Sequence, residues 1–160
     1  MDVEELYRRY AAGERDLPGV DLSHADLNID KVGYPEEIEP DKNDLSGINL
    51  SGANLTRANL SRVNLSGANL SSTNLESATL WGTILTRADL RDAILDYANL
   101  ECDLVDVDLR EASLFCTGLA RTNLTRANLM GAIFQVHVDG YLVFSDTIMP
   151  DGTINNQDYE

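Results

Sequence analysis

Leucine recurs at every fifth position from Leu45 to Leu100, twelve times without a break, and a small or β-branched residue stands two places before nearly every one. The stretch GANLTRANLSRVNLSGANLSSTNL shows the unit: a small residue, Asn or Asp, Leu, and two polar or turn-forming residues. This period fits neither the 3.6 residues of a helical turn nor the two-residue alternation of a strand, so neither element could bury these leucines together. A coil that turns a corner every five residues can. Four units return the chain to its starting direction, which predicts an all-β solenoid.

The repeated A(N/D)LXX unit resembles that of the pentapeptide repeat family, and this likeness implies a right-handed quadrilateral parallel β-helix. The stretches YAAGERDLPGVDLSHADL and DTIMPDGT also resemble cyanobacterial members of that family. Three early repeat centres, Leu17, Leu22 and Leu27, precede an interruption. The centres of the main run are Leu45, Leu50, Leu55, Leu60, Leu65, Leu70, Leu75, Leu80, Leu85, Leu90, Leu95, Leu100, Leu104, Leu109, Leu114, Leu119, Leu124, Leu129 and Phe134.

The chain of 160 residues is interpreted as a single pentapeptide-repeat domain. We expect an N-terminal capping α-helix at residues 2–12, because its apolar residues recur at helical spacing and the first coil of a solenoid has an unpaired strand edge to cover. The first repeats follow at 15–27. An inserted loop is predicted at 28–43, where about 13 residues exceed the period; it is a surface loop or a recognition segment. The main solenoid is expected at 44–134, and a cap and tail at 135–160.

Two irregularities interrupt or end the run. The spacing between Leu100 and Leu104 is four, and placing the omission at this corner keeps Cys102 at the inward small position. The segment QVHVDGYLVF has two short apolar runs around Asp139 and Gly140, which predicts a hairpin that covers the last coil. The acidic tail after it is expected to be mobile.

Composition limits the range of functions. The chain carries a formal net charge of −15, yet residues 45–100 contain four acidic and four basic residues. A mimic of duplex DNA needs a continuous acidic stripe, so this charge favours a role in solubility. No leader peptide and no membrane-length apolar run is found, which predicts a cytoplasmic protein without membrane contact. Two cysteines are too few for a disulfide framework. Cys102 is expected to be buried and Cys116 to lie at an outward corner.

No constellation of residues typical of catalysis, cofactor binding or metal binding is present, so catalytic, cofactor and metal sites are predicted to be absent. Asp92 is expected to stack with Glu111, and Asp89 with Asp108, beside stacked arginines that compensate their charge. The asparagines that precede the central leucines are expected to form ladders of side-chain amides along the coils.

Large apolar residues replace polar outward ones at a few positions. A cluster of this kind on a rigid scaffold suits a protein contact, unless the C-terminal hairpin around Tyr141 and Phe144 folds over it. The sequence thus predicts a non-enzymatic protein–protein interaction scaffold of unknown pathway. It is expected to be a monomer or weak dimer that does not bind nucleic acid directly; the alternative is a DNA-mimicking modulator of DNA gyrase or another topoisomerase. The candidate interaction residues are Trp81, Ile94, Tyr97, Phe115 and Ile133.

Overall fold

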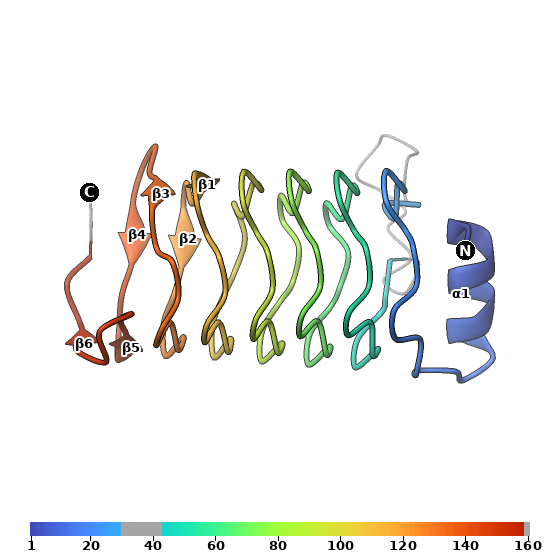
Figure 1. The fold of residues 1–160 in the computed structure, drawn as a ribbon, viewed down its shortest axis with the longest axis horizontal. Helices are drawn as coiled ribbons and strands as arrows, with labels where there is room; N and C mark the ends of the chain where they lie inside the picture. Colours follow the sequence, from blue (N-terminus) through green and yellow to red (C-terminus); the bar gives the residue numbers. More distant parts are fainter. Residues whose placement is uncertain (30–42, 159–160) are drawn as a thin grey trace, which may run out of the picture.

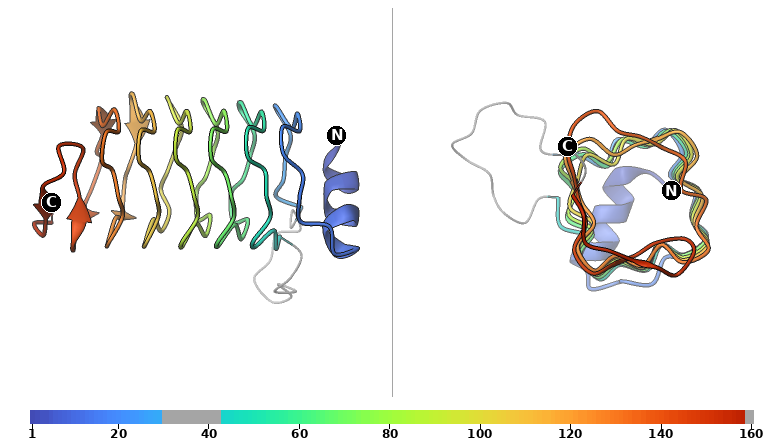
Figure 2. Two further views of the ribbon diagram at one scale, coloured as in Figure 1. Left: turned by 60° about the horizontal axis from the view of Figure 1, so that its bottom comes forward. Right: turned by 90° about the vertical axis from the view of Figure 1, so that its left-hand side faces the viewer.

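The computed structural model describes residues 1–29 and 43–158, which form a column of stacked coils with a helix at the N-terminal end (Figure 1). Viewed along the column, the coils superimpose as a four-sided outline (Figure 2). The named elements are α1 (Val3–Ala11), β1 (Thr117–Gly118), β2 (Thr122–Asn123), β3 (Val136–His137), β4 (Leu142–Val143), β5 (Thr147–Ile148) and β6 (Ile154–Asn155). Most coils are joined by isolated parallel bridges, because each side of a coil contributes only a short extended segment.

Four ladders of parallel bridges join the residues that precede the central leucines, and we name each ladder after one member. Along the chain they follow one another in the order Asp89, Ile94, Gly118 and Asp103. The Asp89 ladder contains Asp16, Asn49, Asn69, Asp89, Asp108, Asn128 and Ile148. The Ile94 ladder contains Asp21, Asn54, Asn74, Ile94, Ser113 and Ile133. The Gly118 ladder contains Asp26, Asn59, Thr79, Asn99, Gly118 and His137, and the Asp103 ladder contains Asp44, Asn64, Ile84, Asp103, Asn123 and Val143.

The core is a column of leucines inside the coils. Every central Leu of the run is buried, and so is the small residue two places before it, as at Ala68. Phe134, the last centre, is only partly buried. At a regular corner the chain passes from one side of the coil to the next through a turn in which the Ala53 amide donates to the Leu50 carbonyl over 3.0 Å. Gly52 occupies the left-handed region, with φ of 66°, so that its amide points to the next coil. The inward assignment is confirmed.

The asparagines stabilise their own corners. In each such repeat the side-chain oxygen accepts the amide two residues later, as from Ser51 to Asn49 Oδ1 over 3.0 Å. Some of their Nδ2 groups reach an aspartate of the preceding coil: Asn49 donates to Asp16 over 2.6 Å. Asn64 donates to Asp44 over 2.9 Å. Among the described residues the asparagines do share ladders, as Asn54 and Asn74 do, but no side-chain amide of a ladder donates to another, so the predicted amide ladders are not hydrogen-bonded there.

The predicted N-terminal helix is present as α1, which lies across the end of the column (Figure 2). Asp2 caps it by accepting the Glu5 amide over 2.8 Å. Leu6 is fully buried against the coil. The hydroxyls of Tyr7 and Tyr10 donate to the first-coil carbonyls of Leu27 and Ser46, over 2.8 and 2.9 Å. The helix therefore buries the open end and occupies carbonyls that no earlier coil could reach.

The predicted insertion shows itself in the ladder spacing. Asp16, at the start of the Asp89 ladder, pairs with Asn49, whereas Asn49 pairs with Asn69. More residues separate the first pair of ladder partners than the second. The difference equals the number of extra residues that the sequence analysis assigned to the inserted loop. Residues 30–42 of the predicted loop 28–43 lie outside the described residues. At its base the Asn43 side-chain amide donates to Asn28 Oδ1 over 3.0 Å, which joins the two ends where the chain leaves and re-enters the coil.

The four-residue spacing is accommodated at one corner, as predicted. Across this corner the step between ladder partners is shorter by a single residue, as for Ile84 and Asp103, and the regular step returns afterwards, as for Asp103 and Asn123. Cys102 is buried at the inward position while Asp103 points outward. The Cys102 amide donates to the carbonyl of Leu100, two residues back, over 2.7 Å. This tighter turn replaces the regular corner without interrupting the Asp103 ladder.

The predicted hairpin over the last coil is wrong. β3 pairs in parallel with β1, and β4 in parallel with β2, so this segment forms two further sides of the solenoid and completes the coil that contains Asn128 and Ile133 (Figure 1). Its alternating apolar residues fit an inward-facing coil side as well as a hairpin arm, which is why the sequence misled. A hairpin does form later, where β5 pairs antiparallel with β6.

The tail prediction is also wrong for residues 151–158. Strand β6 belongs to this segment, and the Asp158 carboxylate accepts the Phe144 amide over 2.9 Å. Asn156 accepts the Asp146 amide over 2.5 Å. The tail thus covers part of the last coil on the side of the Asp103 ladder.

Candidate interaction site

Four of the five predicted interaction residues lie together in the coils nearest the C-terminal end. Ile94 and Ile133 belong to the Ile94 ladder, with Ser113 between them. Tyr97 and Phe115 occupy the next corner, in adjacent coils, and their rings meet edge to face with centroids 5.7 Å apart. We call Ile94, Tyr97, Phe115 and Ile133 the apolar patch.

The C-terminal segment leaves the apolar patch open. The exposed fractions are 42% for Ile94, 55% for Tyr97, 37% for Phe115 and 54% for Ile133. Phe144, which the sequence placed as a possible cover, is buried inside the coil behind the Asp103 ladder, on the opposite side. Of the two alternatives left open by the sequence, the described residues therefore favour a solvent-facing patch.

Trp81 does not join this patch. It is 50% exposed, but it lies at the corner between the Gly118 and Asp103 ladders. The whole Gly118 side of the coil separates it from Tyr97. Its corner stacks on that of Arg62, whose amide donates to the Trp81 carbonyl over 3.0 Å. The sequence analysis grouped Trp81 with the patch because the repeat count readily shows which coil a residue belongs to. It shows less readily at which corner of that coil the residue lies.

The aromatic corner has an unusual anchor. In regular repeats the Asn of the ladder accepts the amide two residues later, but here that ladder position holds Ser113. Asp96 of the preceding coil takes over this role. Its Oδ1 accepts the Ser113 hydroxyl over 2.5 Å and the Phe115 amide over 3.1 Å. Asp96 therefore fixes the backbone that presents Phe115 beside Tyr97.

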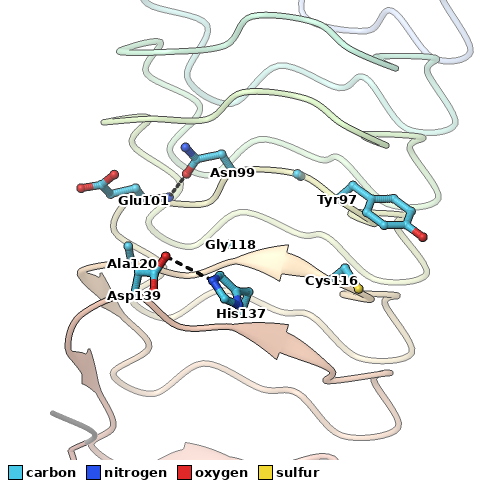
Figure 3. A pocket seen from close by; sticks show the side chains of 9 residues that line it. Tyr97, Asn99, Glu101, Cys116, Gly118, Ala120, His137 and Asp139 are labelled. Atoms are coloured by element: carbon cyan, nitrogen blue, oxygen red, sulfur yellow. Dashed lines mark hydrogen bonds and ion pairs between the residues drawn. The ribbon is translucent and has the colours of Figure 1, made fainter.

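A shallow hollow of about 480 Å³ adjoins the patch on the Gly118 side (Figure 3). Tyr97 and Cys116 stand at one edge, and Glu101 and Asp139 at the other (Figure 3). Gly118 lies between them at the repeat position where Asn is the commonest residue, so no side chain fills the floor. The sequence analysis missed this hollow; the Gly in place of Asn was the signal.

The titratable groups of the hollow do not form a reactive set. His137 Nε2 lies 3.2 Å from Asp139 Oδ2, and both side chains are largely exposed. In Figure 3 the His137 ring points toward Asp139 and away from Cys116, whose thiol is exposed. The described residues contain no group of three or more His, Cys, Asp or Glu that could hold a metal ion.

Near the patch, stacked arginines lie between two columns of acidic residues, and they form salt bridges with only one of the two columns. Arg91 binds Asp89 over 2.6 Å, and Arg110 binds Asp108 over the same distance. The hydrogen bond from Arg91 lowers the pKa of the Asp89 carboxyl below its usual value. The predicted compensation therefore holds for the Asp89 ladder.

Cys102 behaves as the sequence predicted. Burial, with a smaller contribution from the charge of Asp103, raises the pKa of its thiol.

None of the helical segments in residues 1–29 and 43–158 has the length and apolarity that a bilayer crossing needs.

Together these features define a β-solenoid of tandem five-residue units. A family profile described as pentapeptide repeats matches residues 44–82, 68–102 and 102–135, in eight copies. Because these matches span more than half of the chain, the protein belongs to the pentapeptide repeat family. The resemblance read from the A(N/D)LXX unit is thereby confirmed.

Solved structures of cyanobacterial pentapeptide repeat proteins are similar to this chain. HetL from Nostoc sp. strain PCC 7120, involved in heterocyst differentiation regulation, is 22% identical, with 97% of this chain and 100% of that one covered and a TM-score of 0.49. Protein alr5209 from Nostoc PCC 7120 is 27% identical, with 86% and 96% covered and a TM-score of 0.41. Rfr23 from Cyanothece 51142 is 29% identical, with 86% and 90% covered and a TM-score of 0.31. No curated protein matches the sequence significantly.

Proposed function

We propose that this protein is a non-enzymatic scaffold that binds a protein partner through the apolar patch. The observation that supports it best is the exposed edge-to-face pair of Tyr97 and Phe115, held by Asp96 on a stacked and hydrogen-bonded column. Aromatic side chains on a rigid support lose little conformational entropy on binding, and such residues dominate protein interfaces. The hollow beside Tyr97 offers space for a further side chain of the partner. The cytoplasmic location and the right-handed sense of the coil, which the sequence and the family resemblance implied, belong to this proposal.

DNA mimicry toward a topoisomerase has less support. A mimic of a duplex requires acidic groups spaced along the rod, and residues 45–100 carry as many basic as acidic residues. The acidic excess lies mainly in residues 1–44, with 13 acids and 5 bases, and in residues 135–160, with five acids and no base.

The test is affinity capture from the native cytosol with three baits: wild type, Phe115→Ser and Trp81→Ser. Trp81→Ser is the matched control, because it removes an exposed aromatic from another corner. We expect one set of proteins to be retained by wild type and Trp81→Ser and lost with Phe115→Ser. Identical capture by all three baits, or turnover of a small molecule by the pure protein, would contradict the proposal.

A further inference from the structure

Carboxylates border the apolar patch on the side away from the hollow. Asp92 and Glu111 occupy the corner between the Asp89 and Ile94 ladders, in adjacent coils, where the Asp92 amide donates to the Arg110 carbonyl over 3.0 Å. We call Asp92 and Glu111 the acidic rim. The carboxylate of Glu111 extends over Gly131 in the next coil, in space that any larger residue there would fill. The rim therefore runs along the column parallel to Ile94 and Ile133.

The arginines of this corner form their salt bridges with other carboxylates, and the attraction between Arg91 and Asp92 is weaker than that between Arg91 and Asp89. Arg91 and Arg110 extend toward the Asp89 ladder, where each binds an aspartate over 2.6 Å. Among the described residues, neither Asp92 nor Glu111 forms a salt bridge or accepts a side-chain hydrogen bond. Asp96, at the other side of the patch, binds a hydroxyl and an amide but no base.

These observations restrict the chemistry of the partner. A partner that covers the patch also removes water from the rim, and a carboxylate that loses water without gaining a base is strongly destabilised. A neutral or acidic partner would leave these carboxylates unpaired. A lysine or arginine that reaches the rim would pair with them as the patch is buried.

Resting on the proposed function, we infer that the apolar patch and acidic rim bind a basic protein segment, with an aromatic or aliphatic side chain on the patch and flanking lysines or arginines at the rim. Charge complementarity makes this occupant more favourable than a second copy of the chain. Residues 101–160 contain ten acidic and three basic residues, so two copies meeting at this surface would repel.

The experiment selects random peptides displayed on phage against the immobilised full chain. The same selection is made with Asp92→Asn/Glu111→Gln and with Phe115→Ser. The control is Asp103→Asn/Asp146→Asn, which removes the same formal charge from another part of the coil surface. Selected sequences are then synthesised, and their affinities are measured by fluorescence anisotropy at low and high salt.

We expect peptides selected by the wild type to carry Lys or Arg beside an aromatic or aliphatic residue. The rim variant should bind them about tenfold more weakly at low salt, with the difference shrinking at high salt, while the control stays within about twofold of wild type. Neutral or acidic peptides that lose binding only with Phe115→Ser would overturn this inference and leave the proposed function standing. Peptides indifferent to Phe115→Ser, or no selection above blank support, would overturn both. A dimer in sedimentation equilibrium that Phe115→Ser dissociates would assign the surface to a second copy and overturn the inference.

Discussion

Inserting one glycine between Glu101 and Cys102 should restore the corner that this chain shortens. At the regular corner one coil earlier, Gly82 adopts φ of 65° and its amide donates to the Glu101 carbonyl over 2.9 Å. The shortened corner has no residue in that role. In a regular corner the corresponding amide would donate to the Ala120 carbonyl. Among the described residues, that carbonyl accepts only a long hydrogen bond, from the Thr122 hydroxyl over 3.4 Å. An inserted glycine would supply the missing donor.

The expected gain is one backbone hydrogen bond, worth about 0.5 to 1.5 kcal/mol net. Ordering the added residue costs about 1 to 2 kcal/mol in backbone entropy. The free energy of unfolding should therefore stay within about 1.5 kcal/mol of the wild type, because the new hydrogen bond offsets much of that cost. Asparagine at the same point tolerates the left-handed region and should give the better variant.

The control is the same insertion between Ser71 and Ser72, at a corner that is already complete. There the Ser72 amide donates to the Arg91 carbonyl over 2.8 Å, and an extra residue displaces it. That variant should lose about 1 to 3 kcal/mol more than the first, because it leaves a backbone group unpaired and gains no hydrogen bond. Urea unfolding followed by circular dichroism measures both. Equal destabilisation by the two insertions would refute the account of the shortened corner.

Further predictions concern the core, the cap and the thiols. Leu70→Ala should cost about 2 to 5 kcal/mol and Ala68→Leu about 1 to 3 kcal/mol, because one empties and the other overfills a buried position; unchanged thermal melting would contradict the inward assignment. Deleting residues 2–12 should promote association through the uncovered first coil, and light scattering that stays monodisperse would refute the capping role. A thiol reagent should modify Cys116 and spare Cys102 in the native protein; equal rates would contradict the difference in burial. Because burial raises the folded pKa of Cys102, its contribution to stability is complete below the unfolded pKa of about 8.5 and falls above it by about 1.4 kcal/mol per pH unit. Urea titrations between pH 8 and 10, below the range in which the buried Tyr7 also contributes, should show this slope in wild type and not in Cys102→Ala.

The sequence predicted the column because its core is encoded locally and repeatedly. Each Leu needs only the residues of its own corner and its counterpart in the neighbouring coil, so one unit read correctly fixes the rest. Even the irregularities could be located, since the omission near Cys102 and the extra residues before Leu45 both shift a strict period. The error came after Phe134, where the Leu signal stops and β3 and β4 continue the coil with other residues. There the alternation of apolar residues was equally compatible with a hairpin.

The interaction site was less predictable because it depends on which corner, and not only which coil, carries a residue. Ile94 and Ile133 share a ladder by simple counting, so the sequence could bring them together. Trp81 was misplaced by one side of the coil. The arrangement of charge was harder still, since Arg91 has aspartates on both sides of it in the sequence and the direction of its side chain decides which one is neutralised. Its choice of Asp89 leaves Asp92 beside the patch without a salt bridge among the described residues, and this is the property from which a basic partner follows.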